Sequence, residues 1–232
     1  MRADVRRKLE MVEGVRAFNA SHPTEDASHA LVVAKFEEKF KRAEALATQE
    51  RAGRIASKAA SKRRRDLRRG MQSELLHHLL KVGELAGKER PDLAAKFQVT
   101  SRGAAHQVFM TAARAILTDA QEVRDVLVQN GMAATMFDEL AKTVDEFEAA
   151  SNAVRNGRAD HVGAAAELKV VAGELVDLVV LLNGINRFRF RDNPELLAAW
   201  DSARNVVGPM KGKAEPGSAT PPAAGEGLPK AA

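Results

Sequence analysis

The chain has 232 residues, of which 45% are hydrophobic and 29% are charged, and its formal net charge is +5. Only 4% of the residues are aromatic, and tyrosine and cysteine are absent, which argues against a β-sandwich or barrel and excludes disulfides, thiolate metal sites and cysteine nucleophiles. The balance predicts a soluble all-α protein with no β-sheet, and the lack of a signal-like or membrane-length apolar run makes the cytoplasm the expected compartment.

The first expected helix covers residues 3–20 and is short. Its apolar side chains recur at helical spacing and comprise Val5, Leu9, Val12, Val15 and Phe18. A helix of this length needs a partner helix to be stable, and the segment ends before Pro23.

A second and much longer helix is predicted from a cap at Thr24 to about Ala86. Two acids follow Thr24, as is typical of a helix start, and no proline occurs until Pro91. An unbroken helix of this length would extend for about 90 Å, and such helices predict coiled-coil packing in an elongated bundle. Its apolar line comprises Val33, Phe36, Phe40, Ala43 and Ala47, then Gly53, Ala56, Ala60, Leu67 and Met71, and finally Leu75, Leu79, Val82 and Ala86.

The middle of this long helix is strongly basic, because nine cations and a single acid, Asp66, lie between Arg51 and Arg69. Cations that recur every three or four residues form one line on a helix, and here they are Arg51, Arg54, Lys58, Lys62, Arg65 and Arg69, with Arg63, Arg64 and Arg68 beside them. A face of one sign predicts binding to a polyanion such as nucleic acid. Two alternatives stay open: a solvated surface, or pairing with the bundle acids Asp138, Glu139, Asp145, Glu146 and Glu148.

After a connection over residues 87–100, a third helix is predicted from a cap at Thr100 or Ser101. It ends at Asn130-Gly131, a dipeptide that suits a left-handed C-cap with an apolar contact from Met132. An apolar line then continues through residues 136–154, is interrupted at 155–158, and resumes at 162–182. A turn at the interruption predicts an up-down-up-down bundle of four helices, whereas a kink predicts one helix of about fifty residues that demands a second chain.

The C-terminal part reads as a crossing segment, a short helix and a tail. Asn183-Gly184 is expected to end the last bundle helix, and Arg187, Arg189 and Arg191 alternate with two phenylalanines as a secondary site for nucleic acid, or as rings that pin the segment to the bundle. Asn193-Pro194 caps a helix that buries Leu196, Leu197 and Trp200. The chain divides accordingly into 1–64, an N-terminal helical hairpin with the basic helix; 65–183, a four-helix bundle core; 184–207; and 208–232, a tail expected to be disordered.

Motifs for catalysis or metal binding are sparse. Glu74 and His77 have the spacing of one half of a carboxylate-bridged di-metal site, but the second copy of the motif is missing. Asp177, within an apolar run, is expected to be partly buried and to need a cationic partner. We expect no cofactor, and an enzyme is unsupported because no catalytic grouping or phosphate loop can be assembled.

The expected fold is therefore an all-α, elongated antiparallel helical bundle with long helices and an N-terminal helical hairpin extension. The leading functional prediction is a non-catalytic, oligomerising scaffold or adaptor, because the long helix extends beyond the bundle. The alternative is binding of nucleic acid or another polyanion by the Arg51–Arg69 face, and the third is a metal-dependent bundle enzyme. No membrane insertion is expected, since the side opposite the charge is Ala and Gly rather than bulky.

Overall fold

The computed structural model of the chain describes residues 1–88, 90–94, 96–97 and 103–206. Its elements are α1 (Ala3–Ser21), α2 (Ala27–Gly70), the π-helical turn η1 (Met71–Leu75), α3 (Leu76–Ala86), α4 (Pro91–Ala94), α5 (His106–Glu122), α6 (Arg124–Gln129), α7 (Thr135–Arg189) and α8 (Pro194–Ala203). The described residues contain no strand, so the predicted all-α class is confirmed. The tail predicted from Gly208 onward lies outside the described residues.

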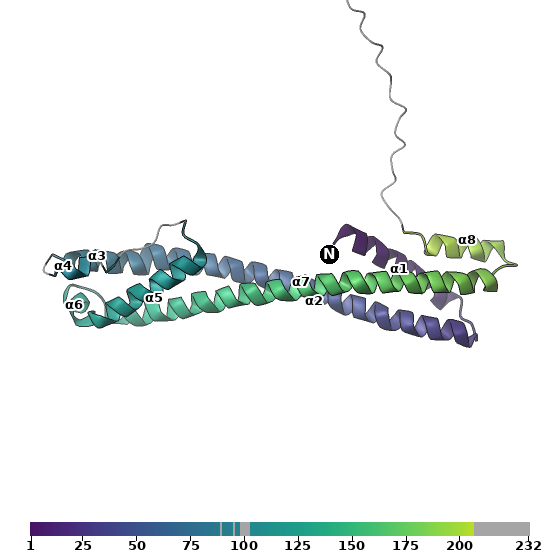
Figure 1. Cartoon of the computed structure of the whole chain (residues 1–232), viewed down its shortest axis with the longest axis horizontal. Helices are drawn as coiled ribbons and strands as arrows, with labels where there is room; N and C mark the ends of the chain where they lie inside the picture. Colours follow the sequence, from purple (N-terminus) through teal and green to yellow (C-terminus); the bar gives the residue numbers. More distant parts are fainter. Residues whose placement is uncertain (89, 95, 98–102, 207–232) are drawn as a thin grey trace, which may run out of the picture.

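Two long antiparallel helices, α2 and α7, form the spine of an elongated molecule (Figure 1). The shorter helices gather at its two ends: α3, α4, α5 and α6 at one end, and α1 and α8 at the other. No helix within the described ranges combines the length and apolarity needed to cross a bilayer. The predicted elongated bundle with an N-terminal helical hairpin is therefore present.

Each end of the spine has its own hydrophobic core. The α3–α6 lobe buries Leu76, Leu79, Phe109, Phe137 and Phe147, together with smaller apolar side chains. The α1–α8 lobe buries Val12, Phe36, Leu46, Leu175 and Trp200 among others. Burial of apolar surface stabilises both lobes.

Between the lobes, α2 and α7 cross with their backbones in contact at Gly53 and Gly157. A methyl group placed on Gly53 would lie 2.8 Å from the backbone nitrogen of His161, and one placed on Gly157 would lie 2.8 Å from that of Ser57. Both glycines are buried, whereas Ala56, expected on this seam, is exposed. Ser57 takes its place toward α7 and donates a hydrogen bond from Oγ to the carbonyl oxygen of Val154 at 3.4 Å.

The long helix predicted to end near Ala86 does continue that far, but one π-helical turn interrupts it. Met71 and Leu76 are both fully buried although they are five positions apart, whereas an α-helix repeats its buried side every three or four positions. The extra residue in η1 absorbs this difference, so α3 keeps its apolar side toward the core.

α7 is a single helix of 55 residues. It passes through Asn156-Gly157 without a turn, so of the two readings of residues 133–182 the structure has the long helix and lacks the up-down-up-down bundle. It also passes Asn183-Gly184, the predicted end, and residues 184–189 are helical rather than a crossing segment. Glycine lowers helix stability without breaking a helix that tertiary packing supports.

Helix ends agree with the sequence only in part. α2 is capped by Asp26, whose side chain accepts a hydrogen bond from the Ser28 backbone, and not by Thr24. The predicted Thr100 or Ser101 cap lies outside the described residues, and α5 begins at His106.

Two caps are confirmed. Gly131 has a φ of 98°, and the Met132 amide donates to the Leu127 carbonyl at 3.0 Å, as a left-handed C-cap requires. At α8, the Asn193 side chain accepts a hydrogen bond from the Leu196 amide at 3.1 Å. The buried Trp200 then donates from Nε1 to Asn183 Oδ1 at 3.0 Å, which fastens α8 to α7.

Candidate polyanion-binding face

Six cations of α2 form an exposed row that we call the basic face. Each side chain is exposed, and none forms an ion pair with any described residue. They recur every three or four residues and therefore lie on one side of the helix. The row extends for about 27 Å at 1.5 Å per residue. Its members are Arg51, Arg54, Lys58, Lys62, Arg65 and Arg69.

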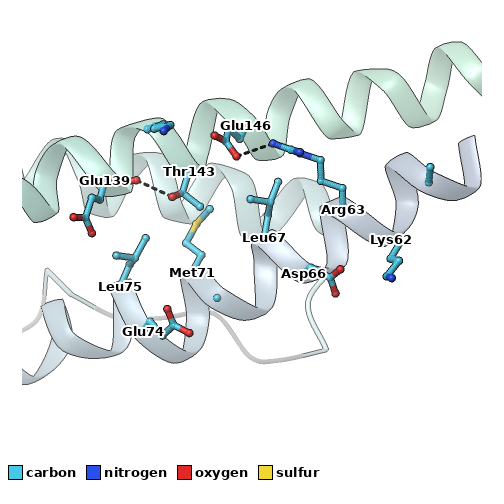
Figure 2. A pocket seen from close by; sticks show the side chains of 13 residues that line it. Lys62, Arg63, Asp66, Leu67, Met71, Glu74, Leu75, Glu139, Thr143 and Glu146 are labelled. Atoms are coloured by element: carbon cyan, nitrogen blue, oxygen red, sulfur yellow. Dashed lines mark hydrogen bonds and ion pairs between the residues drawn. The ribbon is translucent and has the colours of Figure 1, made fainter. Parts of the chain in front are cut away.

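Arg63 points to the opposite side and pairs within the molecule. Its guanidinium donates to Glu146 of α7 at 3.0 Å, whereas Lys62 points away from α7 (Figure 2). Of the five acids considered as partners for the basic segment, Glu146 alone forms an ion pair with it among the described residues. Glu148 pairs with Arg114 of α5 instead.

Arg64 and Arg68 turn toward the packed interior near α5. The Arg68 guanidinium is buried, lies 4.7 Å above the Phe109 ring, and approaches Nδ1 of His106 at 3.3 Å. Burial lowers the pKa of the Arg64 guanidinium, and its Nε atom is enclosed without a hydrogen-bond partner. Arg64 and Arg68 contribute positive potential behind the basic face rather than exposed charge.

At the α3 end, the basic face opens into a cavity of about 540 Å³ that we call the arginine pocket. None of the described residues around it is acidic, and Nε2 of Gln72 is buried there without a hydrogen-bond partner. An oxyanion prefers a hollow with donors and no carboxylate. The lining residues are Arg65, Arg68, Arg69, Gln72, Ser73 and His106.

His106 is the first residue of α5 and closes the arginine pocket from that side. Burial lowers its pKa, and the neighbouring Arg64 and Arg68 cations lower it further. The imidazole is consequently neutral at pH 7, so the positive charge of the pocket comes from its arginines. The helix start beside it adds a small positive potential.

A larger groove of about 790 Å³ lies between α2, η1 and α7, and its charges are mixed (Figure 2). Asp66, Glu74, Glu139 and Glu146 line it together with Lys62, Arg63 and Lys142. Carboxylates on both walls would repel a phosphate. This groove is therefore a poorer anion site than the arginine pocket.

The described residues bring no further metal ligand close to the weak metal candidate, Glu74 and His77. Glu74 and His77 are both exposed. Within the described residues, no group of three acidic, histidine or cysteine side chains is arranged to hold a metal ion.

The secondary arginines lie at the C-terminal end of α7, which is the end beside α1 and α8 (Figure 1): Arg187 and Arg189 belong to its last turn, and Arg191 follows it. Arg189 donates to the carbonyl oxygens of His22 at 2.9 Å and Pro23 at 2.7 Å, so it fastens the α1–α2 connection. Arg187 lies 3.5 Å from Asp201, and Arg191 lies 3.2 Å from Asp192. Their partners within the molecule leave this segment little free charge.

The two rings of that segment behave differently. Phe190 is buried against Phe18 and Trp200, whereas Phe188 is 72% exposed. The expectation that the rings pin the segment to the bundle therefore holds for one of them.

The prediction that Asp177 is partly buried is wrong, because its side chain is exposed. Leu175 and Val179 of the same apolar run are buried in the core, and Asp177 lies on the other side of the helix.

The arginine pocket could not be found from sequence. Gln72, Ser73 and His106 carry no spacing signal, because His106 lies 34 positions after Gln72 and the two meet only because α5, packed on α7, starts beside Arg68 of α2. Comparisons of the chain with protein-family models, curated proteins and solved structures find no match.

Proposed function

We propose that this protein is a non-catalytic helical rod that binds a polyanion, nucleic acid above all, through the basic face of α2. The observation that supports this most directly is the row of six exposed cations without a carboxylate partner among the described residues. Cations on an idle surface are usually interspersed with acids, whereas a row of one sign attracts a linear polyanion.

The dimensions of the row suit a nucleic-acid backbone. A row of about 27 Å runs parallel to about eight phosphates of one DNA strand at 3.4 Å each. The arginine pocket at one end offers room for a terminal or kinked phosphate. Such contacts position a strand without reading its bases. The proposal is therefore binding with little sequence preference and strong dependence on salt.

Titration of duplex DNA and single-stranded RNA at two salt concentrations tests the proposal. The variant Lys62→Glu/Arg65→Glu/Arg69→Glu reverses half of the row. The matched control Lys35→Glu/Lys41→Glu/Lys88→Glu reverses three exposed lysines elsewhere, so both variants change net charge equally. We expect the first to bind duplex DNA at least roughly tenfold more weakly, with the salt slope reduced by about 2.7, and the control to bind as wild type does.

Equal weakening by both triple variants would mean that only net charge matters and would remove the assignment to α2. Wild-type binding that is absent even at low salt would exclude the polyanion function altogether. Circular dichroism of all three proteins shows whether each variant keeps its helices. Because the reversed side chains are exposed, we expect folding to be unaffected.

The second candidate function is an oligomerising scaffold or adaptor, and one observation favours it. Five large apolar side chains of α7 are more than half exposed: Val162, Val170, Val180, Leu181 and Phe188. A patch of this kind is typical of an interaction surface. The molar mass from light scattering tests the proposal, and a monomer at micromolar concentration would exclude it.

Two further properties stay predictions from the sequence: coiled-coil packing of the long helices and a cytoplasmic location.

A further inference from the structure

The outward side of α7 in the α1–α8 lobe is apolar over more than twenty residues. The core of this lobe lies on the opposite side, where Leu168, Leu175 and Leu182 are buried. On the outward side, Val162 is 52% exposed, Val170 60%, Val180 64%, Leu181 57% and Phe188 72%. We call this side the α7 outer face. Exposed sides of helices in soluble proteins are normally charged, yet this one carries only Lys169, Asp177 and Arg187 along its length, and Arg187 lies 3.5 Å from Asp201.

Three glycines lie on or beside the α7 outer face with open space next to each. No heavy atom of the described residues lies within 4 Å of a methyl group placed on Gly163, Gly173 or Gly184. Glycine lowers helix stability relative to alanine, and no packing contact among the described residues compensates for it at these three positions. At the waist the same helix uses Gly157 to bring another helix into backbone contact. Glycines on an apolar outer face allow the same close approach from outside.

We infer that the α7 outer face binds the α7 outer face of a second copy of this chain, antiparallel, about a two-fold axis at Gly173. The inference rests on the scaffold candidate above and names its interface. It is independent of polyanion binding. Under such an axis, residues equally far before and after Gly173 meet across the interface, because a two-fold interface is isologous.

Large and small side chains are complementary under this axis. Val162 lies eleven residues before Gly173, and Gly184 lies eleven residues after it, so the two meet. Ala166 and Val180, seven residues on either side, meet in the same way. Phe188 lies fifteen residues after Gly173, so it faces Arg158, next to the small Ala159, on the partner helix. Alternation of large and small groups lets two helices interdigitate at Gly173.

The charges are complementary as well. Lys169 lies four residues before Gly173, and Asp177 lies four residues after it. Lys169 of each copy therefore faces Asp177 of the other copy, and the dimer contains two such pairs. Both are exposed, and neither has an ion-pair partner among the described residues of its own chain. A parallel arrangement would instead place like charges opposite each other. This pattern favours a second copy of the chain over an unrelated partner.

A groove lies along one edge of the α7 outer face. It has a volume of about 390 Å³, lies between the start of α1 and α7, and is lined by Val5, Val162, Ala165, Ala166 and Lys169 among others. Leu181 lies eight residues after Gly173, and Ala165 lies eight residues before it. Because the two residues lie about 160° apart around α7, at 100° per residue, the partner's Leu181 packs along the other edge of the interface and the groove stays open beside it.

Cysteine cross-linking tests the axis, because the chain has no cysteine of its own. Gly173→Cys places one thiol on the axis, so two copies should form a disulfide under mild oxidation. Val162→Cys alone is the control, since the two thiols would lie about 33 Å apart along the helices. The double variant Val162→Cys/Gly184→Cys should cross-link again, because the cysteine at position 162 of one copy meets the cysteine at position 184 of the other.

Charge exchange provides an independent readout. Lys169→Glu and Asp177→Lys should each raise the dissociation constant of the dimer at least tenfold, measured by analytical ultracentrifugation. The double variant Lys169→Glu/Asp177→Lys should restore it, because the opposite charges again face each other. All these side chains are exposed, so the fold does not depend on them.

The outcomes separate the two proposals. Cross-linking at Gly173→Cys but not at Val162→Cys, with rescue by the double charge variant, supports the axis. An oligomer that persists while Gly173→Cys stays uncross-linked overturns this interface and leaves the scaffold candidate standing. A wild-type monomer overturns both. DNA binding by the basic face is measured separately and is unaffected by either result.

Discussion

At the scale of single residues, the two waist glycines decide how closely the spine packs. Gly53 and Gly157 face each other from α2 and α7, and each carbonyl oxygen lies 3.0 Å from where the other's side chain would begin. The sequence placed Gly53 on the small-residue side of the long helix and left the stretch around Gly157 open as a turn or a kink. In the structure they are the contact itself, which no helix propensity can reveal.

Gly157→Ala should therefore destabilise the protein although it improves helix propensity. A methyl group would meet the backbone of Ser57 at 2.8 Å, and overpacking of this kind costs about 1–3 kcal/mol. Urea unfolding followed by circular dichroism measures the change. Gly70→Ala is the matched control, since no described atom lies within 4 Å of its added methyl, and it should raise stability by up to about 1 kcal/mol. A stabilised Gly157→Ala protein would contradict the close crossing.

Residues of the basic segment also differ in what the sequence could say about them. The three- and four-residue spacing correctly placed six cations on one side of a helix. It placed Arg63 and Arg68 beside this row but could not assign their partners, which are Glu146 for Arg63 and the Phe109 ring for Arg68. Those partners come from α5 and α7, so only the packing of three helices assigns them.

At the scale of elements, η1 lets one long rod serve two cores. The α2 part directs Phe36 and Phe40 into the α1–α8 lobe, and α3 directs Leu76 and Leu79 into the α3–α6 lobe. If η1 were regular α-helix, the extra residue would rotate the apolar side of α3 by about 100° away from its core. The π-turn corrects the phase without ending the rod.

Deletion of Ser73 within η1 should be tolerated. One residue fewer converts the π-turn into a regular α-turn and brings the buried Met71 and Leu76 to a four-residue spacing. Deletion of the exposed Ala59, in the regular part of α2, should instead rotate one half of the rod by about 100° and remove one set of core residues.

Thermal unfolding followed by circular dichroism compares the two deletions. We expect the Ser73 deletion to keep a cooperative transition near that of the wild type, and the Ala59 deletion to lose cooperativity or helix content. If the Ser73 deletion were as damaging as the Ala59 deletion, η1 would not be the phase correction that we describe.

At the scale of the whole molecule, the two hydrophobic cores lie on one spine, but no buried apolar residue belongs to both of them. Between them the seam of α2 consists of Glu50, Gly53, Ser57 and Ala60, which are polar or small. Little apolar area is buried at this waist, so little free energy couples the lobes there. The lobes should consequently open as separate cooperative units.

Trp200→Ala should weaken only the α1–α8 lobe. The indole is fully buried and its loss leaves a cavity, at a cost of about 3–5 kcal/mol. Amide hydrogen exchange should accelerate in α1, α8 and the second half of α7, while α5 and α6 stay protected. Phe109→Ala in the α3–α6 lobe is the reciprocal control and should give the opposite pattern. Uniform acceleration by either variant would show one cooperative unit instead.

The sequence by itself determined which segments are helical, because apolar spacing, proline positions and the Asn130-Gly131 and Asn193-Pro194 caps are local signals, but not every helix end: the third predicted helix is divided into α5 and α6. It also determined that six cations share one side of α2. Only the tertiary structure decided that α7 stays unbroken at Gly157, because the neighbouring α2 backbone supports the helix there. The arginine pocket and the division into two lobes were likewise decided by packing, since contacts between distant segments leave no periodic trace in the chain.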